Sequence, residues 1–200
     1  MLNASDASEE LLELVDGAGR HAGTMGKLAA HRAPGTRHRA FSVFLFDAQG
    51  RMLLQRRAVS KYHSPGVWSN SCCGHPRPGE TPLAAAGRRV REELGVTPQG
   101  LAEAGTAVYR LTDPLSGLVE HEYNHTYVGR VLTPPRPDPA EVADVTMVSA
   151  AELRRMLARE QFSVWFRAVA EIALAGAPAR LAGLGGWSAQ AIVAATGEQA

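Results

Sequence analysis

The feature that most constrains the fold is a turn-rich segment, residues 65–82, that stands between two pairs of strand-like runs. The run 40–46 (AFSVFLF) continues through the turn DAQG into RMLLQRR, and the runs 105–111 and 118–131 are separated by TDPLSG. Short turns between apolar, β-branched runs predict two hairpins. The segment between them, rich in Gly, Pro, Ser and Asn, predicts an ordered loop rather than a regular element, and such loops often carry functional side chains.

An amphipathic helix is predicted directly after this loop. Thr81 is a suitable N-cap, Pro82 suits the first helical position, and Gly95 suits the end. The residues expected to face the core repeat at helical spacing: Leu83, Ala86, Val90 and Leu94. Arg89 and Glu93 stand one turn apart on the other side, on a face that the core does not claim.

The order of elements indicates an α+β fold in a single domain, because strands, loop, helix, strands and helices follow one another without βαβ alternation. A chain of 200 residues with 45% hydrophobic content can bury one sizeable core. We expect residues 1–13 to be a flexible N-terminal segment, residues 14–175 to form the domain, and residues 176–200 to be an Ala/Gly-rich C-terminal tail. Ser149 and Glu152 form a capping box that predicts a short helix.

The charge and the cysteines limit the partners and the compartment. The 21 Lys and Arg residues nearly balance the 20 Asp and Glu residues, so we expect neither nucleic acid nor a membrane as a partner. Cys72 and Cys73 are neighbours and cannot staple distant segments, which favours thiols in a reducing compartment. The N-terminus lacks a signal-like apolar run, so we expect a cytoplasmic protein, as a monomer or weak homodimer.

One group of residues could hold a divalent ion. The period of two along residues 118–131 places Glu120 and Glu122 on one face of a strand. With His31, His38 and His75 they would offer the imidazole and carboxylate ligands that suit a borderline-hard cation. From spacing alone, structural or solvated histidines are the more common explanation.

A second group of residues could bind phosphate. Its cations would surround the same pocket if the two hairpins pack on the helix: Lys27, Arg57, Lys61 and Arg89. Arg and Lys supply the donors that a diphosphate needs, and Glu93 could bring magnesium to the phosphate oxygens. Taken singly, each cation is more often a solvated surface residue.

The loop SNSCCGHP at 69–76 supplies a third group, centred on Cys73. A thiol near cationic groups is readily ionised and can move protons. A buried, inert thiol in a tight turn explains the residues equally well.

Several motifs in the same order resemble the type I isopentenyl diphosphate isomerase family, a branch of the Nudix fold, from roughly Leu14 to Ala170. The resemblance lies in these motifs: KLAAH at 27–31, TRHRAFSVFLF at 36–46, LLQRRAVSK at 53–61, GVWSNSCCGHP at 66–76, REELG at 91–95 and YRLTDPLSGLVEHE at 109–122. Separated motifs in the right order are far more specific than one short pattern. The resemblance implies Nudix-like mixed β-sheets flanked by helices, and a Nudix-type isomerase domain over residues 14–175.

The implied reaction is the metal-dependent, reversible conversion of isopentenyl diphosphate to dimethylallyl diphosphate in isoprenoid biosynthesis. The alternative is a Nudix diphosphate hydrolase, and a non-catalytic sensor of isoprenoid diphosphates or metals is a further one. Gly74, Glu80 and the pair Glu92 and Glu93 fit the hydrolytic motif, but Arg89 stands where hydrolases carry Glu. That exchange removes a metal ligand and adds a phosphate-binding cation, which disfavours hydrolysis.

The resemblance also implies a role for each candidate residue. Cys73 and Glu122 would handle the two protons on opposite faces of the substrate, Tyr109 would orient Glu122, and Trp165 would face the developing cation. The diphosphate would be gripped by Lys27, Arg57, Lys61 and Arg89. One divalent ion, Mn²⁺ or Mg²⁺ with Zn²⁺ as an alternative, would be held by His31, His38, His75, Glu120 and Glu122. A Mg²⁺ ion carried by the diphosphate would be held by Glu93 and the Cys73 carbonyl.

Overall fold

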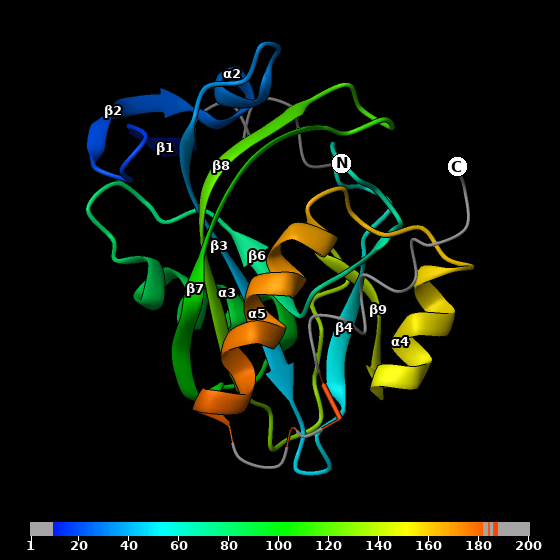
Figure 1. The fold of residues 1–200 in the computed structure, drawn as a ribbon. Coiled ribbons are helices and arrows are strands. Elements are labelled where there is room, and N and C mark those ends of the chain that lie inside the picture. The colour runs from blue at the N-terminus through cyan, green and yellow to red at the C-terminus, as the bar shows by residue number, and fades with distance from the viewer. Residues whose placement is uncertain (1–9, 182–183, 185, 188–200) are drawn as a thin grey trace, which may run out of the picture.

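The computed structural model describes residues 10–181, 184, 186 and 187, and Figure 1 shows how they fold. The strands are β1 (Leu11–Val15), β2 (His21–Gly26), β3 (His38–Phe46), β4 (Met52–Arg57), β5 (Trp68–Ser69), β6 (Cys72–Gly74), β7 (Gln99–Thr112), β8 (Val119–Arg130) and β9 (Val142–Val148). The helices are α2 (Lys27–His31), α3 (Pro82–Leu94), α4 (Ala150–Leu157) and α5 (Phe166–Arg180).

The strands form one curled mixed sheet in which β3 has a central place. β3 pairs antiparallel with β1, β4 and β6, and parallel with β8. The two predicted hairpins are confirmed: β3 meets β4 through Leu45 opposite Leu53, and β7 meets β8 through Tyr109 opposite Glu122. The α+β class is therefore confirmed, since the helices cover a sheet that is not built from βαβ units.

Helices cover both faces of the sheet (Figure 1). Phe44 and Phe46 of β3 belong to the core under α5 and α4, whereas Phe41, Val43 and Leu45 belong to the core under α3. Because both faces are buried, β3 is a continuous apolar run rather than an alternating one. Each such side chain contributes roughly 1.5–3 kcal/mol when it leaves water.

The helix α3 begins and ends where the sequence predicts. The Thr81 hydroxyl accepts from the Ala84 amide at 3.3 Å, and Gly95 ends the helix with φ of 64°. The predicted core face is wrong at Leu83, which is 47% exposed. Ala85 is buried in its place, because the helix meets the sheet only from its second turn onward.

Three predicted boundaries are corrected by the structure. Part of the segment predicted as a loop, residues 65–82, is regular: β5 pairs with β4, and β6 pairs with β3. Strand β1 begins at Leu11, inside the segment predicted to be flexible, because it finds partners in β2 and β3. The predicted tail begins inside α5, and beyond that helix the Trp187 indole donates to the Gly50 carbonyl at 2.6 Å. Apart from residues 184, 186 and 187, the chain after residue 181 lies outside the described part.

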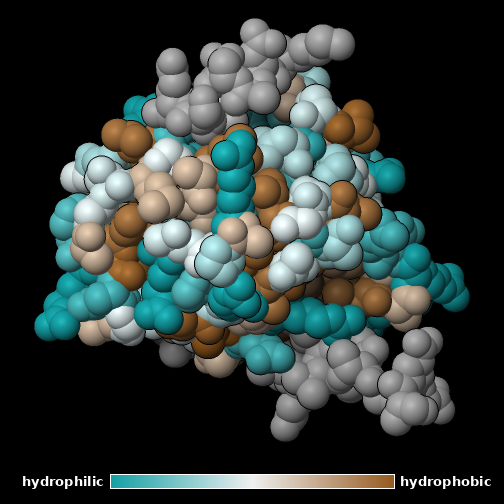
Figure 2. Space-filling model, turned by 90° about the horizontal axis from the view of Figure 1, so that it is seen from above, coloured by the Kyte–Doolittle hydropathy of each residue, from teal (hydrophilic) through white to brown (hydrophobic). Residues whose placement is uncertain are grey.

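None of the described helices is long and apolar enough to cross a bilayer. On the face shown in Figure 2, hydrophobic residues of the described chain are interspersed with hydrophilic ones.

Candidate functional site

The register of four neighbouring strands brings the site residues together. Glu122 of β8 lies opposite His38 of β3 on one side and opposite Tyr109 of β7 on the other. Cys73 of β6 lies opposite Ser42 of β3. Residues opposite one another in a ladder point to the same face of the sheet, so the register itself collects an imidazole, a carboxylate, a phenol and a thiol. The predicted face of β8 is confirmed by the buried positions of its carboxylates.

Five side chains converge on one point and are named here the His/Glu cluster. Its members each offer one ligand atom, these atoms lie within 4.8 Å of one another, and all are buried: His31, His38, His75, Glu120 and Glu122. The Nδ1–H of His31 donates to the Lys27 carbonyl at 2.7 Å, and that of His38 donates to the Thr36 carbonyl at 2.8 Å. These bonds fix the tautomers and leave both Nε2 atoms free to face the cluster.

The polar atoms of the His/Glu cluster lie close together, but their contacts with one another do not satisfy all of them. Nε2 of His38 is 3.2 Å from Nε2 of His75, and Nε2 of His31 is 3.3 Å from a Glu120 oxygen. Among the described residues neither His31 Nε2 nor Glu120 Oε1 has a partner with hydrogen-bond geometry, although His63 Nε2 makes an ion-pair contact with that Glu120 oxygen at 2.7 Å. Buried lone pairs that aim at a common point and lack protons are costly unless a cation balances them. The donor set of imidazoles and carboxylates therefore fits a divalent cation.

The protonation of the cluster also suits a cation. Burial lowers the pKa of His75 to about 4, although a hydrogen bond with Glu122 acts to raise it, so this ring is neutral at physiological pH. Burial alone would raise the pKa of Glu122, but hydrogen bonds with His38 and His75 outweigh it and lower the pKa to about 2. The cluster thus presents a neutral imidazole and an ionised carboxylate.

The second oxygen of Glu122 is held from outside the cluster. It accepts from the Tyr109 hydroxyl at 2.5 Å and from the Asn124 amide at 3.0 Å. Asn124 also contacts the Ser42 hydroxyl at 3.2 Å. The orientation of the carboxylate is therefore fixed by its neighbours on β7 and β8.

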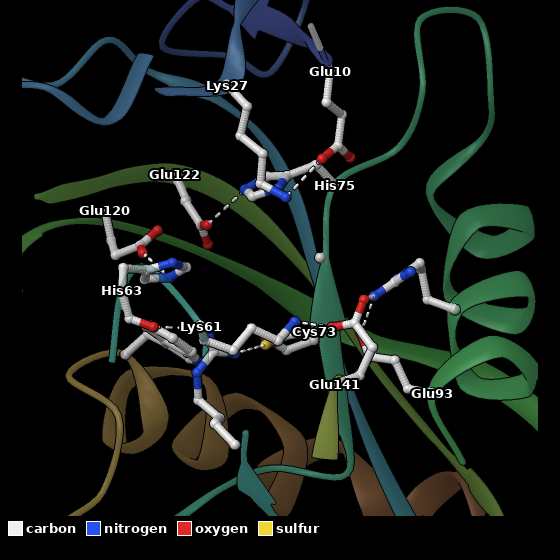
Figure 3. Close-up of a pocket in the computed structure, with 15 residues that line it drawn as sticks. Glu10, Lys27, Lys61, His63, Cys73, His75, Glu93, Glu120, Glu122 and Glu141 are labelled. Carbon is white, nitrogen blue, oxygen red and sulfur yellow. Dashed lines mark hydrogen bonds and ion pairs between the residues drawn. The ribbon is translucent and has the colours of Figure 1, made fainter. Parts of the chain in front are cut away.

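A cavity of about 130 Å³ adjoins the cluster (Figure 3). Of the residues singled out in the sequence, these line it: Lys27, Arg57, Lys61, Cys73, His75, Arg89, Glu93, Glu120, Glu122 and Trp165. His31 and His38 enter through the cluster, and Tyr109 enters through Glu122. The structure thus brings every predicted site residue into one region.

Three of the cations that line the cavity are paired with carboxylates of the chain and are named here the paired cations: Lys27, Lys61 and Arg89. Lys27 Nζ lies 2.7 Å from Glu10. Arg89 Nη2 lies 2.5 Å from Glu93 and 3.1 Å from Glu141, and Lys61 pairs with the same Glu141. Glu93 is buried, so the face of α3 that carries it is turned to the cavity rather than to solvent.

The fourth cation, Arg57, is committed to the protein itself. Its Nε donates to the Ser64 carbonyl at 3.0 Å and its Nη2 to the His63 carbonyl at 3.1 Å. Its Nη1 lies 3.9 Å from the Cys73 sulfur, and its guanidinium carbon lies 5.2 Å from the centre of the Trp165 ring. Arg57 therefore fixes a loop, a thiol and an aromatic ring at once.

Of the two alternatives left open for Cys73, a readily ionised thiol and a buried one, the structure favours the buried one. Burial raises the pKa of the thiol to about 12; Arg57 acts to lower it, and the carboxylates of Glu93 and Glu122 act to raise it. Burial in the packed sheet outweighs the nearby cation, so the thiol keeps its proton at physiological pH.

Trp165 closes one side of the cavity. It is buried, and its indole N–H donates to the Asn70 side-chain oxygen at 3.3 Å. Asn70 in turn donates to the Cys72 carbonyl at 2.6 Å. The ring is thereby tied to the same short strand that carries Cys73.

The sequence analysis missed three charged or titratable residues of the cavity: Glu10, His63 and Glu141. Glu10 lies in the segment predicted to be flexible, and His63 lies in a loop between β4 and β5. Glu141 follows the proline-rich connector of residues 134–139 and gave no signal of its own. The motif LLQRRAVSK ends two residues before His63, and that proximity was the only pointer to it.

The chain is similar to a known domain and to proteins named as isomerases. The NUDIX domain matches residues 36–168. An isopentenyl-diphosphate Delta-isomerase of Streptomyces griseus subsp. griseus is 63% identical over 163 residues, which is 82% of this chain and 83% of the relative. An enzyme of the same name from Nocardia farcinica is 52% identical over 164 residues, 81% of this chain and 93% of the relative.

A solved structure supports the fold. DR0079 from Deinococcus radiodurans matches with a TM-score of 0.63 at 23% identity, over 78% of this chain and 94% of that chain. At this identity the likeness concerns the fold alone.

Proposed function

Since the chain belongs to the isopentenyl-diphosphate Delta-isomerases of the Nudix family, we propose that it interconverts isopentenyl diphosphate and dimethylallyl diphosphate. The observation that carries the proposal is the cavity in which a protonated thiol and an ionised carboxylate, Cys73 and Glu122, lie beside an aromatic ring and paired cations. A hydrolase needs neither the thiol nor the ring.

The reaction moves one proton in and one proton out. Protonation of the terminal CH₂ carbon of the alkene places a positive charge on the neighbouring tertiary carbon, and loss of a proton from the next CH₂ group gives the isomer. The chain needs one group that holds a proton and one that can accept one, and Cys73 and Glu122 meet this need. In the reverse direction their roles exchange.

Trp165 would stabilise the charge between the two proton transfers. A tertiary cation is attracted to an aromatic face and is destroyed by water. The buried ring lines the cavity, and the Arg57 guanidinium and Asn70 amide hold it there. This buried position supports the proposed role, because the ring would form a dry wall beside the developing charge.

The paired cations would bind the diphosphate. Lys27, Lys61 and Arg89 line the cavity, and each is neutralised by a carboxylate of the chain. A diphosphate would replace those carboxylates as the partner of the cations, which keeps the charges balanced in both states. Arg57 would act chiefly by holding its loop and Trp165.

The His/Glu cluster would hold one divalent ion, Mn²⁺ or Mg²⁺, through five residues, and Glu93 with the Cys73 carbonyl would hold a Mg²⁺ ion carried by the diphosphate. When bound, these ions neutralise the carboxylates and the diphosphate and polarise the groups they contact. The role of the chain is to fix the ligands, and the hydrogen bonds of His31, His38 and Glu122 to their outer partners do so.

A Nudix diphosphate hydrolase is the alternative. It is disfavoured by Arg89, which occupies a position where the hydrolytic motif has a carboxylate and instead donates to Glu93 and Glu141. The high identity to isomerases over four-fifths of the chain points the same way.

The test is to incubate the protein with isopentenyl diphosphate and Mg²⁺ in heavy water and to follow the products by NMR. We expect deuterated dimethylallyl diphosphate from the wild type and none above background from Cys73→Ala. His125→Leu, on the opposite face of β8, is the matched control and should retain the wild-type rate.

Three outcomes decide between the candidate functions. Formation of dimethylallyl diphosphate that depends on Cys73 supports isomerisation. Release of phosphate or of a monophosphate would establish the hydrolase instead. Binding of the substrate without any product would favour a sensor.

A further inference from the structure

Three of the five members of the His/Glu cluster are each held by a group outside it, whereas the outer nitrogen of His75, Nδ1, has no hydrogen-bond partner among the described residues. His31 and His38 donate to backbone carbonyls, and Glu122 accepts from Tyr109 and Asn124. Outer partners of this kind orient metal ligands and tune their basicity. Glu120 lacks a comparable hydrogen bond from its own strand or from the neighbouring strands in the described chain.

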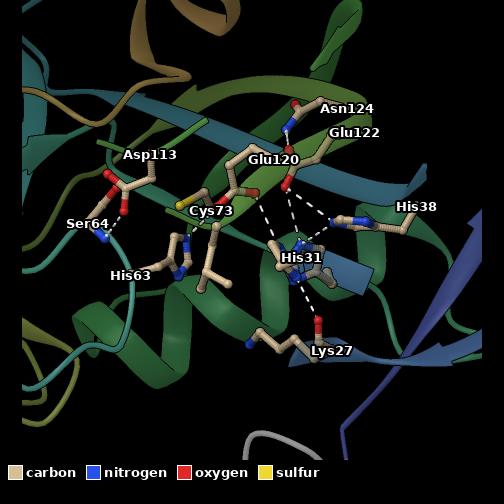
Figure 4. Close-up of polar contacts among 12 residues, drawn as sticks. Lys27, His31, His38, His63, Ser64, Cys73, Asp113, Glu120, Glu122 and Asn124 are labelled. Atoms are coloured by element: carbon tan, nitrogen blue, oxygen red, sulfur yellow. Dashed lines mark hydrogen bonds and ion pairs between the residues drawn. The ribbon is translucent and has the colours of Figure 1, made fainter. Parts of the chain in front are cut away.

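The group that faces Glu120 from outside is His63. Its Nε2 lies 2.7 Å from Glu120 Oε1, on the side of the carboxylate away from His31, which approaches Oε2 at 3.3 Å. Figure 4 shows Glu120 between the two rings. His63 is buried, with an exposed fraction of 8%, and its ring lies 5.5 Å from that of Trp165.

The loop that carries His63 is fixed on both sides. The Arg57 guanidinium donates to the carbonyls of His63 and Ser64 at 3.1 and 3.0 Å. The Ser64 amide donates to the Asp113 carboxylate at 2.8 Å, and Ser64 has φ of 45°, which turns the chain sharply at this point. A non-glycine residue is rarely held in this region, so the surrounding bonds must fix the position of the loop.

We propose that His63 is a positioning residue that orients the Glu120 carboxylate for divalent metal binding by the His/Glu cluster. It acts from outside, because it does not belong to the group of atoms that lie within 4.8 Å of one another. Through its close contact with Oε1 it would keep Oε2 directed at the cluster beside His31. This inference rests on the proposed metal site.

The experiment measures metal affinity without substrate. The metal-stripped protein is titrated with Mn²⁺ in competition with a chromophoric chelator. His63→Leu keeps a side chain of similar size but has no donor, and His63→Gln restores one. We expect the dissociation constant for Mn²⁺ to rise roughly 10- to 100-fold in His63→Leu, and His63→Gln to recover most of the loss.

The matched control is His125→Leu. His125 also pairs with a carboxylate, Glu103 at 2.9 Å, but on the other face of β8. Its substitution should leave Mn²⁺ affinity unchanged, and circular dichroism of the chelator-treated proteins checks that all variants fold. If His63→Leu does not fold, His63→Asn and His63→Gln are compared instead. The His63→Gln protein, which has the longer amide, then has to bind Mn²⁺ at least several-fold more tightly than the His63→Asn protein.

Each other outcome overturns a stated claim. Wild-type affinity in His63→Leu, or equal losses in His63→Leu and His63→Gln, would overturn the positioning role. An equal loss in His125→Leu would also overturn it, because the effect would not be local. Failure of the wild type to bind Mn²⁺ would overturn the metal site itself, with His63's role, while isomerisation is judged separately in the NMR assay.

Discussion

The His/Glu cluster and the paired cations lie around one cavity, but their charges are balanced in opposite ways. In the cluster, buried lone pairs of imidazoles and carboxylates face one another, and several polar atoms have no partner among the described residues. Among the paired cations, Lys27, Lys61 and Arg89 each already contact a carboxylate.

This difference indicates two ways of preparing a binding site. The cluster is preorganised for a cation, since three of its five ligands are fixed by outer hydrogen bonds and need little rearrangement to bind one. On the proposed function, the paired cations are preorganised for an anion, because the carboxylates that now neutralise them would give way to the diphosphate. Metal should therefore add stability to the fold, whereas a diphosphate should exchange one set of ion pairs for another.

The largest effect is expected when the group shared by both functions is changed. Glu122→Gln keeps the shape of the side chain but removes the charge that faces His38 and His75 and the acceptor for a substrate proton. We expect the rate of isomerisation to fall by about 10³-fold or more. The rate is measured by NMR with saturating isopentenyl diphosphate and Mg²⁺.

A matched change on the same strand sharpens this prediction. His121→Gln alters a side chain on the opposite face of β8, and it should leave the rate within about twofold, because residues of alternate parity do not reach the cavity. A Glu122→Gln rate close to that of the wild type would remove the carboxylate from the proton transfers.

Removal of metal should separate the two regions. At a metal concentration 100 times the dissociation constant, a ligand that binds only the folded state stabilises it by about 2.7 kcal/mol. A chelator should therefore lower the melting temperature of the wild type by several degrees, and should lower that of Glu120→Gln far less. Calorimetry makes the measurement, and an equal shift in both proteins would contradict a metal site built on Glu120.

A smaller effect is expected from Tyr109→Phe, which deletes the hydroxyl that donates to Glu122 at 2.5 Å. A hydrogen bond to a charged group contributes about 1.5–3 kcal/mol, so the turnover number should fall roughly 10- to 100-fold. The Michaelis constant should change little, because the hydroxyl acts through Glu122. Tyr123→Phe, on the other face of β8, serves as the control, and a loss confined to the Michaelis constant would assign Tyr109 to substrate binding instead.

Much of the fold can be predicted from the sequence, because helix caps and tight turns are set by residues close together in the chain. Thr81, Pro82 and Gly95 mark the ends of α3, and the turns DAQG and TDPLSG mark the hairpins. The cluster residues could be identified only because their motifs resemble a known family. Spacing alone did not show whether the histidines are metal ligands. His38 lies opposite Glu122 only because β3 pairs with β8, and the sequence does not say which strands pair.

The missed residues enter the site through contacts between distant segments. The Asp138 amide donates to the Glu93 carbonyl at 2.9 Å, and this bond carries the connector, and Glu141 after it, to the end of α3. Glu10 reaches Lys27 because β1 pairs with β2. The state of the Cys73 thiol stayed open for the same reason: burial is a property of the packed sheet, which the sequence of the loop does not reveal.

A substitution of Glu141 tests directly whether its carboxylate takes the place of a phosphate. If its carboxylate occupies the place of a phosphate, Glu141→Gln should tighten the binding of inorganic pyrophosphate to the metal-free protein by about two- to fivefold, the range of a partly exposed ion pair. Lys61→Met should weaken the same binding. Isothermal titration calorimetry compares both with the wild type, and weaker binding in Glu141→Gln would mean that the carboxylate supports the anion site instead.

The pH dependence of stability gives the smallest and most specific test of the same carboxylate. Burial alone would raise the pKa of Glu141 above its ordinary value of 4.5, but Lys61 and Arg89 outweigh burial and lower it to about 2. A carboxyl group whose folded pKa is depressed stabilises the protein above its unfolded pKa and loses that contribution as the pH falls through the folded value. Glu141→Gln should therefore be less stable than the wild type by about 1 kcal/mol near neutral pH, and this difference should shrink as the pH falls from about 5 toward 2.

Urea unfolding of the chelator-treated proteins measures this difference in stability, with the exposed Glu160→Gln as the control. A difference that stays constant over this range would mean that the ion pairs with Lys61 and Arg89 do not form in solution, and the paired cations would then be free to bind a diphosphate without exchange.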